Sequence, residues 1–149
     1  MGSKTVQRDA IDDFVDYAIE LFPFLDRETE AAVDRIAKLT KRFDLQTDAT
    51  AERFGMKRGE FRLLVKLRLA PDMRLSPGDL AAQLELSTGA MTNRLDRLEA
   101  AGLARREPDP DDRRALIVRL TPTGLASVEA ALEAQGAEEQ RILQALTPE

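Results

Sequence analysis

Residues 75–120, LSPGDLAAQLELSTGAMTNRLDRLEAAGLARREPDPDDRRALIVRL, decide the fold that this sequence predicts. Two helix starts lie in its first half: Ser76 is followed by a proline and an acidic residue, and Ser87 precedes a run with helical spacing. Gly102 ends the second helix, because glycine is the usual residue after a helix C-terminus. Two helices joined by a turn of a few residues form a helix-turn-helix, whose second helix fits the major groove of DNA. That second helix carries an apolar stripe formed by Met91, Leu95 and Leu98.

A charged hairpin follows the two helices. Residues 103–108 and 115–120 have the patterns of short strands, and the polar turn 109–114 separates them. A helix-turn-helix followed by such a hairpin is a winged helix-turn-helix. Along the second strand, two sets of residues alternate between the faces of the sheet: Leu116, Val118 and Leu120 on one, Ile117 and Arg119 on the other.

The second helix and the hairpin tip carry the residue types that DNA binding needs. Small and hydrogen-bonding side chains near the N-terminus of the helix suit phosphates and base edges. Arginines at the tip suit a narrow, A/T-rich minor groove. The predicted DNA-binding residues are Ser76, Ser87, Thr88, Gly89, Ala90, Thr92, Asn93, Arg94, Arg97, Asp112, Arg113 and Arg114.

The same pattern has three other interpretations. A helix-turn-helix is also a plain corner between helices, winged helices also dock proteins, and a polar hairpin tip is also an ordinary solvated turn. The order of helix, turn, helix and basic hairpin favours DNA. A protein-docking module has no need of the paired Arg113 and Arg114.

Composition and charge exclude several other classes of protein. The chain has no cysteine and no histidine, which excludes disulfides, cysteine redox sensing, every histidine-dependent triad and the best zinc ligands. It has no glycine-rich phosphate loop. We therefore expect no enzyme, no metal and no cofactor. The net charge of −5 hides a basic centre, because residues 56–120 carry 13 basic and 10 acidic side chains and the flanks are acidic.

The rest of the sequence predicts helices. Apolar spacing predicts helices over residues 6–22, 26–51 and 57–69, with Asp26 capping the second and Gly55 ending it. Thr121-Pro122 begins a long helix with a heptad-like seam. The seam consists of Leu125, Val128, Leu132, Gln135, Glu139, Ile142 and Leu146. This seam either packs on its own domain or forms a dimer interface, and the length of the terminal helices favours a dimer. No apolar run is long enough to span a membrane and no secretory signal is present, so we expect a cytoplasmic protein.

The sequence resembles the MarR family of bacterial transcription regulators over about residues 29–149. The motifs that carry the resemblance are FGMKRGEF at 54–61, TGAMTNRLDRLE at 88–99, Gly102-Leu103, DPDDRR at 109–114 and LTPTG at 120–124. The resemblance implies a homodimer whose N- and C-terminal helices intertwine below two winged lobes. It also implies that residues 87–97 lie on the recognition helix and that Arg114, held by Asp112, enters the minor groove.

The expected fold is mainly α with a small β-hairpin wing (α+β). Residues 1–149 form a single MarR-like domain, with dimerisation helices at 6–51 and 121–149 and a DNA-binding lobe at 56–120. The expected function is a ligand-responsive, dimeric repressor that binds double-stranded DNA at a pseudo-palindromic operator. The alternatives are a protein-docking winged helix and an architectural DNA binder without a ligand.

With its extra N-terminal helix, the chain resembles the urate-responsive branch of the family. Members of that branch carry a tryptophan in this helix and an aspartate after the Glu-Phe pair, whereas this chain has Ala18 and Arg62 there. We therefore expect a small aromatic or anionic effector other than urate. Its predicted lining is Tyr17, Phe24, Phe43, Phe61, Arg62 and Lys66, although the aromatic residues among these also suit a core.

Overall fold

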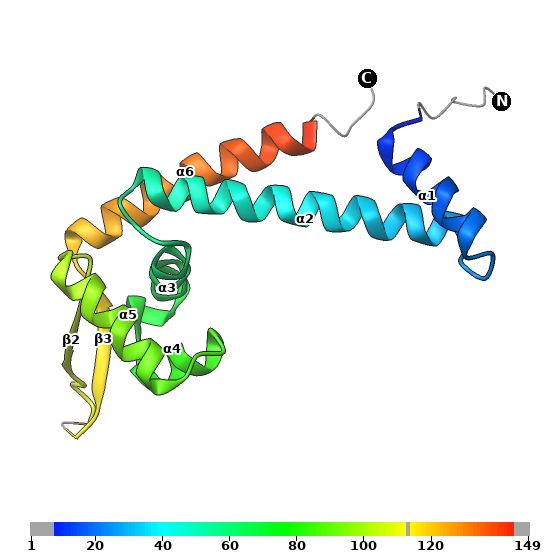
Figure 1. Ribbon diagram of the computed structural model, residues 1–149. Helices are drawn as coiled ribbons and strands as arrows, with labels where there is room; N and C mark the ends of the chain where they lie inside the picture. Colours follow the sequence, from blue (N-terminus) through cyan, green and yellow to red (C-terminus); the bar gives the residue numbers. More distant parts are fainter. Residues whose placement is uncertain (1–7, 113, 145–149) are drawn as a thin grey trace. The chain divides into compact units, whose positions relative to one another are not determined.

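The computed structural model describes residues 8–112 and 114–144, in two compact units, residues 1–45 and 46–149 (Figure 1). Helix α2 runs from the first unit into the second. The elements are α1 (Ala10–Leu21), α2 (Arg27–Arg53), α3 (Arg58–Leu69), a 3-10 turn η1 (Pro71–Met73), β1 (Arg74–Leu75), α4 (Pro77–Gln83), α5 (Thr88–Ala100), β2 (Ala104–Pro108), β3 (Leu116–Leu120) and α6 (Pro122–Gln144).

The first unit is a helical hairpin whose two helix starts are capped by aspartates. The carboxylate of Asp9 accepts hydrogen bonds from the backbone amides of Ile11 and Asp12, and the Asp12 carboxylate accepts one from the Asp9 amide. This capping box starts α1 at residue 10, later than predicted. Asp26 accepts a 2.9 Å bond from the Thr29 amide, which confirms it as the cap of α2.

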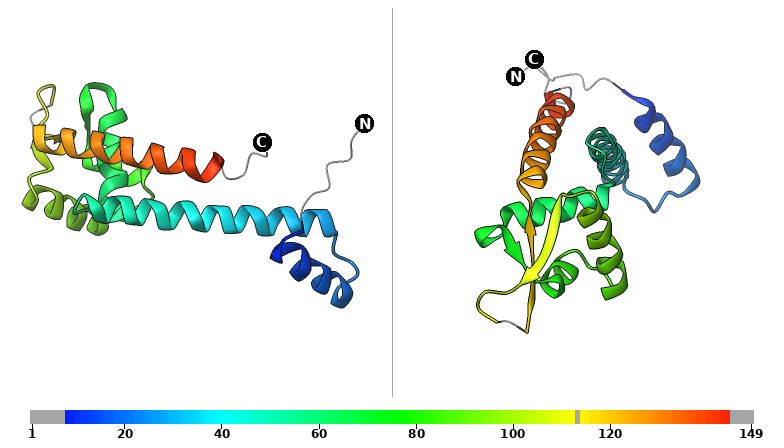
Figure 2. Two further views of the ribbon diagram at one scale, coloured as in Figure 1. Left: turned by 90° about the horizontal axis from the view of Figure 1, so that it is seen from above. Right: turned by 90° about the vertical axis from the view of Figure 1, so that its left-hand side faces the viewer.

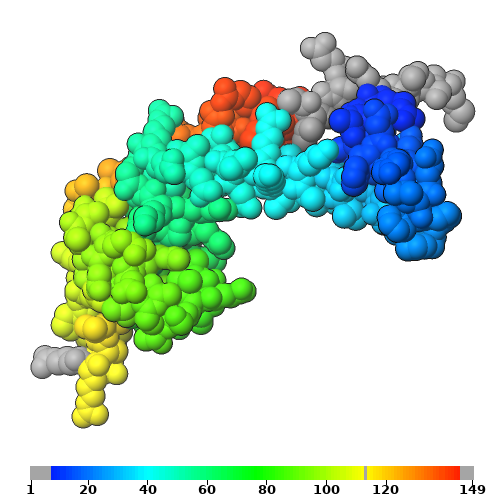
Figure 3. All heavy atoms as spheres, viewed as in Figure 1, coloured from blue at the N-terminus to red at the C-terminus, as the bar shows by residue number. Residues whose placement is uncertain are grey.

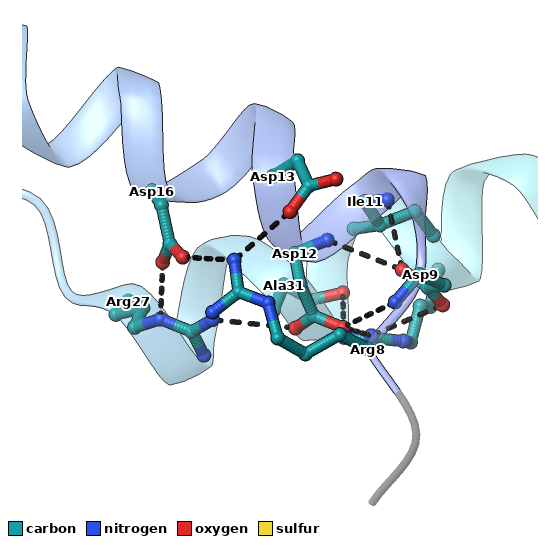
Figure 4. Close-up of polar contacts among 9 residues, drawn as sticks. Arg8, Asp9, Ile11, Asp12, Asp13, Asp16, Arg27 and Ala31 are labelled. Carbon is teal, nitrogen blue, oxygen red and sulfur yellow. Dashed lines mark hydrogen bonds and ion pairs between the residues drawn. The ribbon is translucent and has the colours of Figure 1, made fainter.

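Charged side chains hold much of this hairpin together. Among its described residues, 8–45, the buried apolar side chains are Ile11, Val15 and Ala31, with Ile19 packed against them. Around them, three arginines bind four aspartates (Figure 4). The pairs are Arg8 with Asp13 and Asp16, Arg27 with Asp12 and Asp16, and Arg35 with Asp9 and Asp12.

The second unit, residues 46–149, is the winged lobe, and it is organised around an apolar core. Helices α3, α4 and α5 pack with the small sheet and with the first half of α6. Gly55 and Gly102 have φ of +71° and +69°, the left-handed conformation that ends the preceding helices as predicted. The side chains that are fully buried in this core include Leu63, Leu64, Leu67, Leu80, Met91, Leu95, Leu98, Val118 and Val128.

The wing is a three-stranded antiparallel sheet with strand order β1-β3-β2, where the sequence predicted only a hairpin. The additional strand is the two-residue β1, in which Arg74 pairs with Arg119. The register along β3 is regular, so its residues alternate between the faces as predicted, but Leu116 at the outer end is 49% exposed whereas Ile117 is 4% exposed. Leu116 pairs with Pro108 at the far end of the hairpin. There the strands extend beyond the helices of the lobe (Figure 1, and the right-hand view of Figure 2).

Helix α6 begins directly against the turn that follows α5. The Thr121 hydroxyl donates to the Gly102 carbonyl and accepts from the Gly124 amide, and the Thr121 amide donates to the Leu103 carbonyl. A Cβ on Gly124 would lie 1.7 Å from that Leu103 oxygen, so only glycine fits here. The heptad-like seam is buried at Val128, Gln135 and Ile142, whereas its last position, Leu146, lies outside the described residues.

Candidate nucleic-acid interface

Helix α5 is positioned by a serine cap and an apolar stripe. The Ser87 hydroxyl accepts a 3.3 Å bond from the Ala90 amide, as a helix N-cap does. Met91, Leu95 and Leu98 are at most 2% exposed, so this stripe anchors the helix in the lobe. Ser76 caps α4 in the same way, through a 3.0 Å bond from the Asp79 amide.

The opposite side of α5 is open to solvent. Most of the predicted contact residues of this helix are exposed, and Ala90 and Arg94 are partly buried. The Thr92 hydroxyl donates to the Thr88 carbonyl, which leaves the oxygen of that hydroxyl free to accept. A helix N-terminus with small, hydrogen-bonding side chains is what a major-groove reader needs. The exposed residues are Thr88, Gly89, Thr92, Asn93 and Arg97.

The two arginines of this helix are placed differently. Arg94 turns back onto α3, where its Nη1 donates a 3.2 Å bond to the Gly59 carbonyl. Its guanidinium occupies the space that a side chain at residue 59 would need, 2.6 Å from an added Cβ. The Arg97 side chain is 50% exposed, and its Nε donates a 2.6 Å bond to Glu60 Oε1. Arg97 therefore lies beside Asn93 on the open side of the helix, and Arg94 does not.

A second ionic contact fixes the wing on α5. Arg106, on the inner face of β2, binds both Glu99 and Asp96 of α5, and its backbone amide donates a 2.6 Å bond to Glu99 Oε1. The guanidinium of Arg106 holds the pKa of the Glu99 carboxyl below its usual value, because its hydrogen bonds favour the charged form. Arg106 was not among the predicted functional residues, because its partners lie on α5 and only the arginines of the hairpin tip were expected to have a role.

The tip of the wing is an aspartate-rich turn. Asp112 accepts a 3.0 Å bond from the Arg114 amide, and Asp109 accepts one from the Asp111 amide, so both acids shape the turn through backbone groups. Arg114 is exposed and Arg113 lies outside the described residues. Figure 3 shows the wing projecting from the rest of the lobe, as a groove-reading element does.

Three further arginines form a row across the outer face of the wing. Arg119 of β3 lies directly opposite Arg74 on one side and Arg105 on the other. Like charges in this position repel, and acidic neighbours offset the repulsion. Glu107 pairs with Arg105 and Arg119, and Arg74 pairs with Asp72 and Asp111. The row is therefore neutralised within the lobe.

Known proteins share both the sequence and this arrangement. Residues 54–115 match the model of the MarR family. The transcriptional regulator PecS of Dickeya dadantii is 31% identical over 129 residues, which cover 85% of this chain and 77% of PecS. The chain belongs to the MarR family of transcription regulators. The multiple antibiotic resistance protein MarR of Salmonella typhimurium is 36% identical over 77 residues, about half of each chain.

Solved structures of MarR-family proteins have the same fold. AbsC, a MarR-family regulator from Streptomyces coelicolor, superposes with a TM-score of 0.72 at 25% identity and covers 84% of each chain. A MarR variant from E. coli complexed with operator DNA superposes with a TM-score of 0.64 at 26% identity, covering 87% of this chain and 86% of MarR. The winged helix-turn-helix predicted from the sequence is confirmed. The relatives are transcription regulators and not enzymes.

The predicted effector residues of this MarR-family chain fall in different places. Tyr17 and Phe24 are 61% and 83% exposed, and Phe43 is partly buried, all in the first unit. In the lobe, Phe61 is 4% exposed and belongs to the core. Arg62 and Lys66 line separate hollows, Arg62 beside Arg58, Gly59, Leu84, Leu86 and Arg94, and Lys66 beside Leu69, Ala70, Pro71, Leu75 and Gln83.

The described part of the chain has no residue cluster suited to a metal ion and no helix suited to a membrane span. Among residues 8–112 and 114–144, no three acidic, histidine or cysteine side chains gather so that they could hold a metal ion. No helix there is both long and apolar enough to cross a membrane.

Proposed function

We propose that this MarR-family chain is a homodimeric, ligand-responsive repressor that binds a pseudo-palindromic operator in the cytoplasm. The observation that carries this proposal is the open side of α5 together with the projecting wing. Helix α5 offers small and hydrogen-bonding groups for the major groove, and Arg114 is exposed at the tip of the wing for the minor groove. A winged helix uses both elements to bind DNA, and this lobe has both.

Apolar surface on the helical hairpin supports a dimer. Many large apolar side chains there are about half exposed or more, which is costly unless a second chain covers them. A two-fold dimer places two recognition helices about one helical turn apart, roughly 10 bp, on one face of the duplex. The exposed residues are Phe14, Tyr17, Leu21, Phe22, Phe24, Val33, Ile36 and Leu45.

The hollow beside Arg62 supports a small carboxylate as effector. Its volume is about 240 Å³, and it combines guanidinium groups with two leucines, so it suits an anionic group on an apolar body. Arg62 has no hydrogen-bond or ion-pair partner among the described residues and is exposed to solvent. A ligand there would release DNA only if it binds the DNA-incompetent conformation more tightly than the competent one.

A mobility shift on the DNA upstream of the chain's own gene tests the core of the proposal. We expect one specific complex with two protein chains on a symmetric site, and relief of reporter repression when the effector is added. Light scattering that shows a monomer at micromolar concentration would contradict the dimer.

Calorimetry tests the effector site with salicylate as the probe. Arg62→Ala should abolish binding, and the matched variant Lys66→Ala, in the other hollow, should retain it. Equal affinity in both variants would remove Arg62 from the site.

A further inference from the structure

Glu60, in the first turn of α3, is a buried carboxylate on which two elements converge. Its side chain is 10% exposed. One oxygen accepts a 2.8 Å bond from the backbone amide of Lys57, at the N-cap of α3. The other oxygen accepts the 2.6 Å bond from Arg97 Nε of the recognition helix. Glu60 therefore joins the start of α3 to the open side of α5.

Arg97 is held from one side only. A guanidinium has five N–H groups, and the Arg97–Glu60 bond uses Nε. Within residues 8–112 and 114–144, the terminal Nη groups of Arg97 bind no other side chain or carbonyl. Half of the Arg97 side chain is exposed, one helical turn beyond Asn93. A guanidinium fixed in this way keeps its outer edge free for a second anion, and a phosphate matches that edge with two parallel bonds.

Glu60 stays charged in this position. Burial acts to raise the pKa of its carboxyl, but the bonds from the Lys57 amide and from Arg97 outweigh burial and leave the pKa below the usual value. A fixed negative charge next to a DNA-binding surface opposes phosphate binding. On charge alone, the lobe would bind DNA more tightly without Glu60.

We propose that Glu60 is a positioning residue for DNA binding, which orients Arg97 so that its free edge meets a backbone phosphate beside the major groove. This inference rests on the proposed operator binding. Arg97 is then the phosphate contact, and Glu60 acts through it without touching DNA. The gain from a pre-oriented guanidinium exceeds the repulsion between the Glu60 charge and DNA.

The direction in which one substitution changes operator affinity distinguishes a positioning role of Glu60 from a simple effect of its charge. Glu60→Gln removes the charge but keeps the cap of α3, because glutamine serves in a capping box as glutamate does. Glu85→Gln is the matched control: Glu85 is exposed in the turn between α4 and α5, and it has no ion-pair partner in the described part of the lobe. We expect Glu60→Gln to weaken operator binding on the order of tenfold, the size of one charged hydrogen bond. Glu85→Gln should bind as the wild type does or slightly more tightly.

The salt dependence identifies the phosphate contact. In fluorescence anisotropy titrations at several salt concentrations, Arg97→Ala should lower the slope of log K against log salt by about 0.9, the value for one phosphate. Adding Glu60→Gln to Arg97→Ala should cause no further loss, since Glu60 acts only through Arg97. Unfolding midpoints of all variants establish that the lobe is folded.

The outcomes are distinct. If Glu60→Gln binds the operator as tightly as Glu85→Gln does, or if Arg97→Ala keeps the full salt slope, the positioning role is wrong while operator binding stands. If the wild type binds no DNA, the proposed function fails, and this inference fails with it.

Discussion

The helical hairpin and the winged lobe are stabilised by different interactions. The lobe has a continuous core of fully buried leucine, valine and methionine side chains. Within residues 8–45, the hairpin buries three apolar side chains, and it surrounds them with ion pairs in which most partners are a third or more exposed. Exposed ion pairs contribute little each, whereas each buried leucine contributes about 1.5–3 kcal/mol. We therefore expect the lobe to be stable by itself, and the exposed aromatic side chains of the hairpin fit the dimer proposed above.

The largest effect is expected from a substitution that disrupts the contact between α6 and the turn after α5. Gly124→Ala should destabilise the lobe by about 3 kcal/mol or more, because its Cβ would overlap the Leu103 carbonyl and the backbone must move. Gly136→Ala on the same helix is the control: a Cβ there meets nothing within 4 Å, and alanine should stabilise the helix by roughly 0.5–1 kcal/mol. Urea unfolding measures the free energy of unfolding of both variants. If Gly124→Ala is no less stable than Gly136→Ala, the start of α6 is packed more loosely than its contacts imply.

The next effect concerns operator binding, which we assign to the lobe and not to the hairpin. Asn93→Ala should weaken operator binding by about 1–3 kcal/mol and relax the preference at one base pair in each half-site, through loss of a base contact. The unfolding midpoint should not change, because Asn93 is exposed. Binding to a panel of single-base operator variants measures this loss, and an unaltered preference at every position would place the base contact elsewhere on α5.

A smaller effect is expected at the wing. Arg114→Ala should cost about 1 kcal/mol on operators with A/T-rich flanks and less on G/C-rich flanks, because a narrow minor groove attracts the guanidinium. Paired titrations on the two operators give the difference. Equal losses on both would mean that Arg114 binds a phosphate and does not read groove width.

The smallest effect is a loss of stability at low pH that we expect in the hairpin before the lobe. The bond from the Asp12 amide lowers the pKa of Asp9, and the bond from Arg27, followed by that from Arg8, lowers the pKa of Asp16. A lowered folded-state pKa means that the stabilisation is complete above the unfolded value of about 4 and is lost as the pH falls below it. Between pH 7 and pH 5 we expect no change.

Hydrogen exchange tests this expectation on both parts at once. Below about pH 4, or in about 1 M salt, which screens exposed charges beyond roughly 3 Å, the amides of α1 should lose protection before those of α5. Simultaneous loss in both helices would show that the hairpin does not depend on its ion pairs.

Features set by neighbouring residues were predictable from the sequence. The serine caps of α4 and α5, the Asp26 cap of α2 and the two glycine helix ends are determined within a few residues, and all appear in the structure. Strand β1 was not predictable, because two residues form a strand only by pairing with β3, more than 40 residues later.

The placement of the two arginines of α5 could not be predicted from local sequence patterns. Arg94 and Arg97 are three residues apart and have the same chemistry, so the sequence predicted both as DNA contacts. Their different placement depends on α3, where Gly59 leaves room for one guanidinium and Glu60 accepts a bond from the other. Neither partner lies within 30 residues of its arginine in the sequence, and no helical periodicity carries that information.

Hydroxyl-radical footprinting on the DNA upstream of the gene tests the central claim most directly. A dimer that reads DNA through two α5 helices should protect two tracts related by two-fold symmetry, about 10 bp apart on one face of the duplex, with weaker protection of the flanking minor grooves by the wings. A single unsymmetrical tract, or uniform weak protection without a site, would contradict operator binding by a dimer of this chain.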